Sequence, residues 1–589
     1  MLNTPAMNQL SEPLAVALDR HQAGHMAEAE RGYRAILNER PDHVDALHYL
    51  GVLLHQRGDN EDAAKLLDRA LGLAPNGCAC WSNRGLVAAG LGDLPHAVEC
   101  YERALVIDPA FGNARNNLGT ALQKEGRFDE SIEQHELLLA QDPDFIDARL
   151  NLGSTLASAK RYDEALAVYR ETLARDPGNF HAHFGEGNAL RELKRFDEAV
   201  ASLRRALALK PDHFEATVNL GTTLGLFGKF VEAEAQYRRA LTLRDDPQIH
   251  VCVGAAIGSQ GRFEEEEPYY RHALTLVPDH ADALHNLALL ELRRGNYKEG
   301  WALHEVRWRS SKYKPMNVPG VPEWRGESLQ GKTLLVAGEQ GHGDMMQFAR
   351  YIPVLERMGA TVDMWVPENI VELIQSVSGI RRALQKGSTK GYDYWTPSMS
   401  VPYRVAHLVP GVLADTPYMS VSAERIGSWP ARVKKLASNR RKISIVWAGS
   451  PTFGNDQFRS MPFAAWSPLA EVANTAWFSL QKGAARNQLM QPDCALKPHD
   501  LTDDIHDFAD TAALIEQLDL VITVDTSVAH LAGALGKPVW VFLPANYDWR
   551  WMLDRDDSPW YPGMRLFKQT TLGDWTEPVS RAKAALMAG

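Results

Sequence analysis

Apolar, small and polar positions recur with a period of 34 residues through the first half of the chain. One copy reads Asn151-Leu152-Gly153, then Arg161 to Ala165, then Asp176-Pro177. A helical pair of this length cannot bury its apolar stripe alone, so the pattern predicts copies that stack into a superhelix with a concave inner wall. The period is marked by Pro41, Pro75, Pro109, Pro143, Pro177 and Pro211, and in a second register by Gly51, Gly85, Gly119, Gly153, Gly187 and Gly221.

Each marked position has a packing role in such a pair. A glycine is expected where two helices approach too closely for a side chain, with a small residue such as Ala165 or Ala199 on the second helix. Proline ends the second helix because it lacks an N–H and clashes with the preceding turn. Counting the period places the solenoid at residues 10–309, with about nine units, the last of which depart from the consensus as terminal repeats do.

The pattern then changes from helical pairs to alternating strands and helices. Residues 310–329 carry prolines and basic residues, and we expect a linker there. Thr333–Ala337 is an apolar run typical of a buried parallel strand, and a glycine-rich turn, a helix over Met345–Met358 and a strand over Thr361–Trp365 are expected to follow. Residues 330–435 should therefore form one doubly wound α/β half.

A second α/β half is expected over residues 436–589. Ligands of such sheets bind outside the carboxyl ends of the strands. The expected elements are strands at Ile443–Ala448, Trp477–Leu480, Leu520–Val524 and Val539–Leu543, and helices at Asp510–Leu518 and Val528–Leu535.

Composition narrows the functional class. The length of 589 residues predicts more than one domain, and a formal net charge of −11 argues against general nucleic-acid binding. Cys78 and Cys80 lack a second ligand pair at zinc spacing, so no metal site is expected. Met1–Arg20 lacks a basic start followed by an apolar core, and no run of about 18 apolar residues occurs, so we expect a cytoplasmic protein without a membrane span.

Several motifs resemble known families. The 34-residue pattern resembles the tetratricopeptide repeat (TPR), and the segment from Asp525 to Pro538, DTSVAHLAGALGKP, resembles the donor-site signature of the family-9, heptosyltransferase-like glycosyltransferases. Gly343-Asp344 is similar to the Gly-Asp that opens the first helix of that family's acceptor half, and Asn455–Pro462 is similar to the acidic-basic-proline loop after the first strand of its donor half. The resemblance covers roughly residues 330–570 and implies a GT-B fold of two Rossmann-like halves.

The order of the two regions adds a second resemblance. TPR units followed by a GT-B region are similar in architecture to the O-GlcNAc transferases and to bacterial protein glycosyltransferases, including those that modify flagellin. The His-Thr-Thr-Gly donor motif of the O-GlcNAc transferases is absent from the sequence, so this likeness is limited to architecture. It implies a nucleotide-sugar donor and a reaction that needs no metal or other cofactor.

The turn Asp525-Thr526-Ser527 is the expected donor site. It opens a helix, where free N–H groups and two hydroxyls can hold a leaving phosphate, although Thr526 and Ser527 could instead only cap the helix. His530 lies one helical turn further and could reach the same phosphate, or could pack beneath the sheet. The expected cationic residues are Arg459 and Lys482, the second of which ends a predicted strand. Asp456 could hold Arg459 in place by an ion pair, or Arg459 could be a solvated loop residue.

Asp344 is the expected catalytic base if transfer inverts the anomeric centre. Its carboxylate, at a strand-to-helix turn, could accept the proton of the acceptor hydroxyl, or it could only cap the helix. Glu339 and His342 in the same loop are the substitutes. Asp554-Arg555-Asp556 looks like the metal-binding Asp-x-Asp of another glycosyltransferase fold, but we favour a charged loop. The aromatic rings of residues 547–551 could stack on the donor's base or only pack between the halves.

A row of asparagines stands two residues before the glycine position in several repeats. An amide both donates and accepts a hydrogen bond, so such a row can pair with a peptide backbone whatever its side chains. In superhelices like those of the O-GlcNAc transferases the matching row faces the concave wall, which implies binding of extended protein segments; asparagine is also common there in repeats with other ligands. The residues are Asn83, Asn117, Asn151, Asn219 and Asn286.

These features predict a metal-independent GT-B glycosyltransferase. It would move a sugar from a nucleotide sugar to Ser or Thr hydroxyls of a protein held by the TPR concave surface, with flagellin among the candidates. Two alternatives remain: a catalytically inactive TPR scaffold that binds a nucleotide sugar, and a transferase of lipopolysaccharide-type glycan assembly whose repeats recruit partner enzymes. Donor hydrolysis by purified protein separates the scaffold from the enzymes, and the sugar's destination separates the enzymes.

Overall fold

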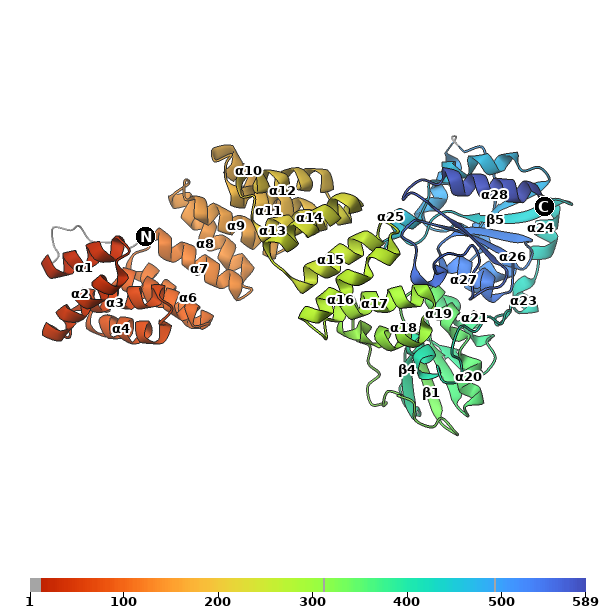
Figure 1. Ribbon diagram of the computed structural model, residues 1–589, viewed down its shortest axis with the longest axis horizontal. Helices are drawn as coiled ribbons and strands as arrows, with labels where there is room; N and C mark the ends of the chain where they lie inside the picture. The colour runs from red at the N-terminus through yellow and green to blue at the C-terminus, as the bar shows by residue number, and fades with distance from the viewer. Residues whose placement is uncertain (1–11, 311–312, 492–493, 589) are drawn as a thin grey trace. The chain divides into compact units, whose positions relative to one another are not determined.

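The computed structural model describes residues 12–310, 313–491 and 494–588 (Figure 1). Some predicted features lie outside the described residues. These are the start of the first repeat near residue 10, the first part of Met1–Arg20, residues 311 and 312 of the expected linker, and Gly589. The fold is a helical repeat solenoid followed by an α/β region with two parallel sheets, consistent with the expected GT-B arrangement. The chain divides into two compact units, Met1–Leu243 and Arg244–Gly589.

The solenoid consists of consecutive helix pairs. Its helices are α1 (Glu12–Gln22), α2 (Met26–Glu39), α3 (Val44–Gln56), α4 (Asn60–Leu73), α5 (Cys78–Gly90), α6 (Leu94–Ile107), α7 (Gly112–Lys124), α8 (Phe128–Gln141), α9 (Ile146–Ser158), α10 (Tyr162–Arg175), α11 (Phe180–Glu192), α12 (Phe196–Leu209), α13 (Phe214–Leu226), α14 (Phe230–Leu243), α15 (Pro247–Gly258), α16 (Glu267–Leu276), α17 (Ala281–Arg294) and α18 (Tyr297–His304). A Cβ on Gly153 would lie 2.6 Å from Tyr169 Cε1, so this close approach between α9 and α10 requires glycine, as expected.

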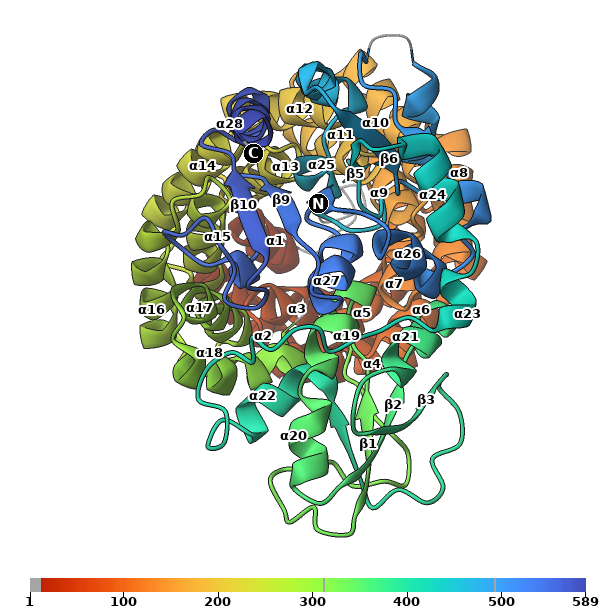
Figure 2. The same ribbon diagram turned by 90° about the vertical axis from the view of Figure 1, so that its right-hand side faces the viewer.

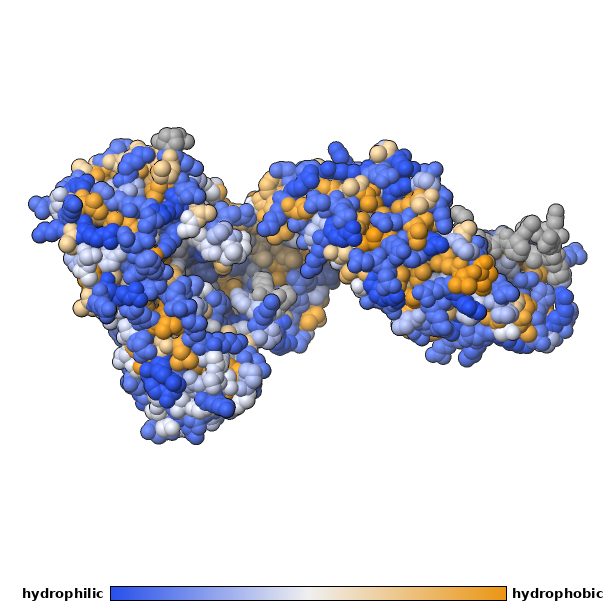
Figure 3. All heavy atoms as spheres, turned by 180° about the vertical axis from the view of Figure 1, so that it is seen from behind, coloured by the Kyte–Doolittle hydropathy of each residue, from blue (hydrophilic) through white to orange (hydrophobic). Residues whose placement is uncertain are grey.

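The first compact unit contains α1 to α14. Its apolar core is divided into successive clusters, of which the largest runs from Leu14 to Val87, because each repeat buries its apolar face mainly against its neighbours. None of the described helices, in this unit or the second, combines the length and apolar character that a membrane span requires. Hydrophilic residues cover most of the surface visible in Figure 3, with smaller hydrophobic patches between them.

The second unit contains α15 to α18 and the α/β region. The acceptor-side half consists of β1 (Thr333–Ala337), α19 (His342–Ala349), α20 (Ile352–Arg357), β2 (Thr361–Trp365), α21 (Val371–Gln375), β3 (Ile380–Leu384), β4 (Tyr394–Pro397) and α22 (Val401–Arg404). The donor-side half, with the helices that lead into it, consists of α23 (Ala423–Ile426), α24 (Trp429–Ala437), β5 (Arg441–Val446), α25 (Asp456–Arg459), β6 (Thr475–Ser479), β7 (His499–Asp500), α26 (Phe508–Ile515), β8 (Leu520–Val524), α27 (Ser527–Ala534), β9 (Val539–Leu543), the 3-10 helix η9 (Trp549–Trp551), β10 (Met564–Lys568) and α28 (Thr576–Ala588).

Both sheets are parallel within the described residues. The acceptor-side sheet has the strand order β3-β2-β1-β4, and the donor-side sheet has the order β10-β9-β8-β5-β6-β7. One continuous apolar core joins the end of the solenoid to both halves, from Trp301 through Met346 to Val541. The carboxyl ends of the strands, where ligands of such sheets bind, are therefore held on one connected framework.

The sequence located most of these elements. β1, β2, β8 and β9 have the expected bounds, and the strands and helices now labelled β5, β6, α26 and α27 are shifted by one to three residues. The single helix expected over Met345–Met358 was wrong: α19 ends at Ala349 and α20 begins at Ile352. Pro353, in the first turn of α20, has no N–H with which to continue α19, so the chain starts a new helix.

Residues at the end of the solenoid pack against the α/β region. Trp301 of α18 meets Phe348 and Trp549 edge to face, with ring centroids 5.8 and 5.3 Å away. Arg307, which is fully buried, donates from Nε and Nη2 to the carboxylate of Glu339 over 3.1 and 3.0 Å. Although residues up to 309 continue the repeat pattern, the last two helix pairs thus belong to the same compact unit as the sheets.

Candidate functional site

The first turns of α19 and α27 lie where the expected site residues meet. α19 follows β1 and α27 follows β8, so both helices begin at carboxyl ends of strands. The two helices contact each other, as Figure 2 shows. A Cβ on Gly343 would lie only 2.7 Å from His530 Cδ2, so the approach of the two halves depends on glycine at this position. The contact brings the expected base, Asp344, close to the expected donor turn, at the carboxyl ends of the strands of both sheets.

Asp344 is held by both of its carboxylate oxygens. Oδ2 accepts a hydrogen bond of 2.8 Å from the N–H of Gly341, and Oδ1 accepts one from Nη2 of Arg550. The side chain is 18% exposed. One oxygen thus caps the first turn of α19, while the other faces a cation contributed by the donor-side half. The capping role does not exclude the role of base, because the two use different oxygens.

Arg550, in η9, lies among carboxylates. Its side chain is 8% exposed, its Nη1 donates to Asp548 Oδ1 over 2.7 Å, and its Nε donates to Gln347 Oε1 over 2.8 Å. Burial lowers the pKa of Arg550, but Asp344 and Asp548 more than offset this, so its pKa is raised. The sequence pointed to residues 547–551 only for their aromatic rings; the missed signal was an arginine in the loop after β9 that stands two residues from Asp548.

The donor turn lies at the carboxyl end of β8. Burial and the charge of Asp548 raise the pKa of Asp525 to about 6, and Trp551 Nε1 donates to Asp525 Oδ2 over 3.0 Å. Thr526 occupies the N-cap position of α27, but its side chain does not cap the helix; its Oγ1 lies 3.0 Å from Thr523 Oγ1. Ser527 begins the helix. The first N–H groups of α27 are therefore not covered by the Thr526 hydroxyl.

His530 is buried in the contact between the two halves. Its Nδ1 lies 3.0 Å from the Tyr561 hydroxyl, and its ring stacks on Trp551 with centroids 5.5 Å apart. Burial, with the charge of Arg550, lowers the pKa of His530 well below its usual value, so the ring is neutral. A neutral imidazole here can orient a ligand or a neighbouring side chain by hydrogen bonding, without adding positive charge.

The two expected cationic residues differ in their surroundings. Arg459 is held as expected, with Nε donating to Asp456 Oδ1 over 3.0 Å and its guanidinium over the Phe453 ring. Its charge acts on the donor turn, because it opposes the rise in the pKa of Asp525. Lys482 donates from Nζ to the carbonyl of Ile505, and among the described residues no contact links it to the donor turn. Its role in donor binding stays a prediction.

Glu339 and His342, the alternative candidates for the catalytic base, interact with residues outside the donor turn. Glu339 pairs with Arg307 and accepts the N–H of Met399 over 2.8 Å, and burial, partly offset by Arg307, raises its pKa. His342 Nε2 lies 3.0 Å from Asn369 Oδ1. Glu339 thus anchors the end of the solenoid, and Asp344 is the carboxylate of this loop that faces the donor half.

A cavity of about 400 Å³ opens at the carboxyl ends of β9 and β10. Lys568 lies in it, donating to the Met552 carbonyl over 2.8 Å, and burial lowers its pKa to about 8. Asp554 and Asp556 line the same cavity, and in this part of the described chain no three side chains form a metal-ligand group. The interpretation of Asp554 to Asp556 as a charged loop stays a prediction.

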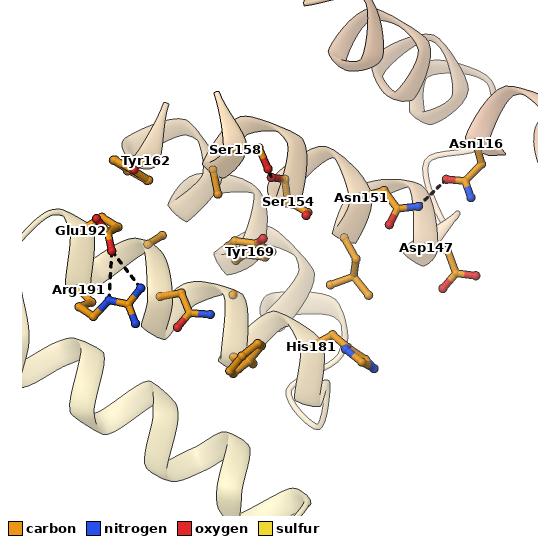
Figure 4. Close-up of a pocket in the computed structure, with 16 residues that line it drawn as sticks. Asn116, Asp147, Asn151, Ser154, Ser158, Tyr162, Tyr169, His181, Arg191 and Glu192 are labelled. Carbon is orange, nitrogen blue, oxygen red and sulfur yellow. Dashed lines mark hydrogen bonds and ion pairs between the residues drawn. The ribbon is translucent and has the colours of Figure 1, made fainter. Parts of the chain in front are cut away.

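A second cavity, of about 870 Å³, lies in the first unit between α7, α9 and α11 (Figure 4). Asn151 of the expected row lines it and donates from Nδ2 to Asn116 Oδ1 over 3.0 Å. Asn188 and His181 line it from α11. Asn116 and Asn188 were not expected, because neither stands at the row position two residues before the repeat glycine. Asn116 lies one residue before that position, and Asn188 lies three residues after it, since Gly185 holds the row position in its repeat.

The other asparagines of the row lie outside this cavity. Asn219 Nδ2 donates to Asn188 Oδ1 over 2.9 Å, and Asn83 Nδ2 lies 2.7 Å from His48 Nε2. Asn117 is half-buried, and Asn286 is buried. Side-chain hydrogen bonds between adjacent repeats thus orient several amides of the row, and Asn151 is the member of the row that lines a cavity large enough for a ligand.

Comparison with known proteins supports both regions. Tetratricopeptide repeat models match residues 14–77, 78–111, 116–180 and 156–213, and the model of glycosyltransferase family 9 (heptosyltransferase) matches residues 480–542. The chain is 26% identical over 340 residues to Protein FlbA of Caulobacter vibrioides, covering 51% of this chain and 54% of that protein. The chain therefore spans about half the length of this relative.

Solved structures show weak overall similarity. A tetratricopeptide repeat protein from Parabacteroides merdae is 16% identical, with 42% of this chain and 98% of that chain covered, at a TM-score of 0.36. MamA from Desulfovibrio magneticus RS-1 is 17% identical, with 28% and 95% covered, at a TM-score of 0.27. The repeats and the family-9 match make the chain a tetratricopeptide-repeat protein with a glycosyltransferase family 9 domain.

Proposed function

We propose that this protein transfers a sugar from a nucleotide-sugar donor to Ser or Thr hydroxyls of a protein segment recruited by its repeats, with flagellin one candidate acceptor. The family-9 match and the repeats support glycosyl transfer and protein binding in general. The observation that carries the proposal is the meeting of Asp344, Arg550 and the first turn of α27 at the carboxyl ends of both sheets. Because nucleotide sugars are cytoplasmic substrates, we place the reaction in the cytoplasm.

The donor's phosphates fit the positive groups around α27. The N-terminus of a helix with uncovered N–H groups attracts an anion, and Arg459 and Arg550 add two full positive charges near it. Such preorganised groups can stabilise the charge that develops on the leaving phosphate. We therefore propose a metal-independent reaction, with Asp525, Thr526, Ser527 and His530 shaping the donor site.

Asp344 is proposed as the base of an inverting transfer. The acceptor oxygen forms a bond to the anomeric carbon as the bond from that carbon to the phosphate oxygen breaks. The hydroxyl proton passes to Asp344, and the nucleotide leaves with its negative charge beside Arg550. Before the donor binds, Arg550 occupies one oxygen of Asp344. A phosphate that engages Arg550 would release that oxygen at the moment when the base is needed.

The cavity between α7, α9 and α11 is the proposed recruitment site for the acceptor. It exposes amides, hydroxyls and aromatic rings together, including Asn151, Ser154 and Tyr169 (Figure 4). Amides can pair with an extended backbone, while the apolar surfaces accept side chains of varied shape. This combination favours a protein segment over a glycan lipid as the ligand of the repeats.

A transfer assay tests the proposal. Purified full-length protein is incubated with a panel of labelled nucleotide sugars and with candidate acceptor proteins, and label is measured on protein, in a lipid extract and as free sugar. Label on protein, lost in Asp344→Asn and kept in the exposed control Asp415→Asn, supports the proposal. Label only in lipid would favour glycan assembly, and donor binding without turnover would favour a scaffold; either result would overturn protein transfer.

A further inference from the structure

Three metal-binding side chains converge on the solenoid part of the second unit. Asp245 lies in the connection before α15, His250 lies in α15, and His272 lies in α16. Their ligand atoms all lie within 4.8 Å of one another. Spacing along the chain does not predict this group, because His250 and His272 are 22 residues apart and come together only when the two helices pack.

The distances suit one metal ion. Asp245 Oδ1 lies 2.7 Å from His250 Nε2 and 3.5 Å from His272 Nε2. Tetrahedral zinc with bonds of about 2.0–2.1 Å sets its ligand atoms roughly 3.3 Å apart. The two distances lie on either side of that value, so small side-chain rotations would complete the geometry. Two imidazoles and one carboxylate also form a donor set that binds zinc and related divalent transition metals more readily than it binds magnesium or calcium.

The exposure of the three residues leaves room for a further ligand. The side chain of His250 is 12% exposed, whereas those of Asp245 and His272 are 58% and 47% exposed. His250 is thus held against the helices, and the other two residues face water. Water can therefore take the fourth position, as it does in zinc sites with three protein ligands.

A hydrogen-bonded ion pair is the alternative for this group. Asp245 with His250 alone would explain the distance of 2.7 Å, but it does not require the second histidine. The rings of His250 and His272 have centroids only 4.2 Å apart, so both imidazoles are presented to the same carboxylate oxygen. Two imidazoles that share one acceptor are better explained by a common cation.

We propose that Asp245, His250 and His272 bind one Zn²⁺-like divalent ion, which fastens the start of the second compact unit to the α15–α16 pair. The site is built from elements other than those of the sugar-transfer site and does not depend on the proposed function. Nδ1 of His250 is buried without a hydrogen-bond partner among the described residues. Because an outer partner of that kind typically strengthens metal binding by about 10–100-fold, the expected affinity is moderate.

Zinc titration of the full-length protein tests the proposal. After treatment with EDTA and dialysis, ZnCl₂ is added in a calorimeter to the wild type, His272→Gln, Asp245→Asn and His407→Gln. His407 is an exposed histidine outside the group, so its substitution is the matched control. We expect one site in the wild type and the control, and binding at least tenfold weaker in the other two variants. Both altered side chains are exposed, and circular dichroism checks that the variants fold.

Hydrogen exchange provides a second measurement. Zinc should slow amide exchange in the peptide that covers residues 244–250 in the wild type and in His407→Gln, and should leave it unchanged in His272→Gln. Equal zinc affinity in all four proteins would place the metal elsewhere, for example on cysteines, and would overturn the proposal. Absence of zinc binding by the wild type would overturn it equally.

Discussion

Replacing Asp344 by Asn separates its possible roles. Asn Oδ1 can still accept the N–H of Gly341, so the cap on α19 survives, but the amide cannot take a proton from an acceptor hydroxyl. A positioned general base contributes about 10²–10⁴-fold to a rate. Turnover should therefore fall about 100- to 10,000-fold. If Asp344 only capped the helix, turnover would change little.

Donor affinity should move in the opposite direction. The substitution removes a carboxylate that competes with the donor phosphate for Arg550, while Asp548 stays in place. Arg550 stays charged in the variant, so its hydrogen bond to the new amide moves from the strong towards the weak end of the range of about 1.5–3 kcal/mol for hydrogen bonds to charged groups. The difference of roughly 1 kcal/mol corresponds to about fivefold tighter donor binding.

The assay combines calorimetry and turnover. Binding of the cognate nucleotide sugar and initial transfer rates are measured for the wild type, Asp344→Asn and Asp415→Asn, whose exposed side chain lies in the same half. Slower transfer with equal or tighter donor binding is the expected pattern. Unchanged turnover would remove Asp344 as the base. Weaker donor binding would contradict the competition between Asp344 and the donor for Arg550.

Further predictions concern the donor, the metal, the acceptor and pH. His530→Ala and Arg459→Ala should each weaken donor binding in calorimetry, and unchanged affinity in both would exclude them from the site. EDTA should leave transfer within about twofold, a change of roughly 0.4 kcal/mol in barrier, whereas a collapse restored by Mn²⁺ would refute metal independence. A triple variant, Asn116→Ala, Asn151→Ala and Asn188→Ala, should lose three amide hydrogen bonds to the acceptor at about 1 kcal/mol each. It should therefore bind the acceptor more than 100-fold more weakly in a pull-down than the exposed control Asn113→Ala, with donor hydrolysis unchanged. Full acceptor binding by the triple variant would place the acceptor elsewhere. The raised pKa of Asp525, about 6, means that the folded state binds its proton more tightly than the unfolded state, so its contribution to stability is present below about pH 4 and is lost as pH rises through 6. Asp525→Asn should therefore raise the midpoint of urea unfolding at pH 7 but not at pH 4, and an equal effect at both would contradict the assignment.

Local pattern was enough to locate much of the fold. β1 and β8 are short apolar runs that are buried within parallel sheets. The first and last residues of such a run mark the ends of the strand, so the sequence predicts its bounds. The break between α19 and α20 also had a local signal in Pro353, although the apolar pattern continued across it. Glycines such as Gly153 marked close helix contacts because no other residue fits there.

The site was only partly predictable, for a different reason. Asp344 and the donor turn stand in motifs, so they could be named from the sequence. The role of Arg550 depends on the side chains that surround it. One of them, Asp344, is more than two hundred residues away along the chain, so the sequence does not show that the two are paired. The metal-binding group is similarly invisible until α15 and α16 pack. Sequence order does not reveal which charges become neighbours when two sheets and a solenoid share one core.

The division of the chain at residues 243 and 244 has a consequence for how such proteins can vary. Before this point each repeat contacts mainly its neighbours, so gain or loss of a whole 34-residue copy would lengthen or shorten the solenoid and leave the core of the second unit complete. After it, loss of a copy would uncover Phe348 and Trp549 and leave Glu339 buried without Arg307. Natural insertions and deletions, and engineered exchanges of acceptor preference, should therefore fall before Leu243 and spare the last two helix pairs.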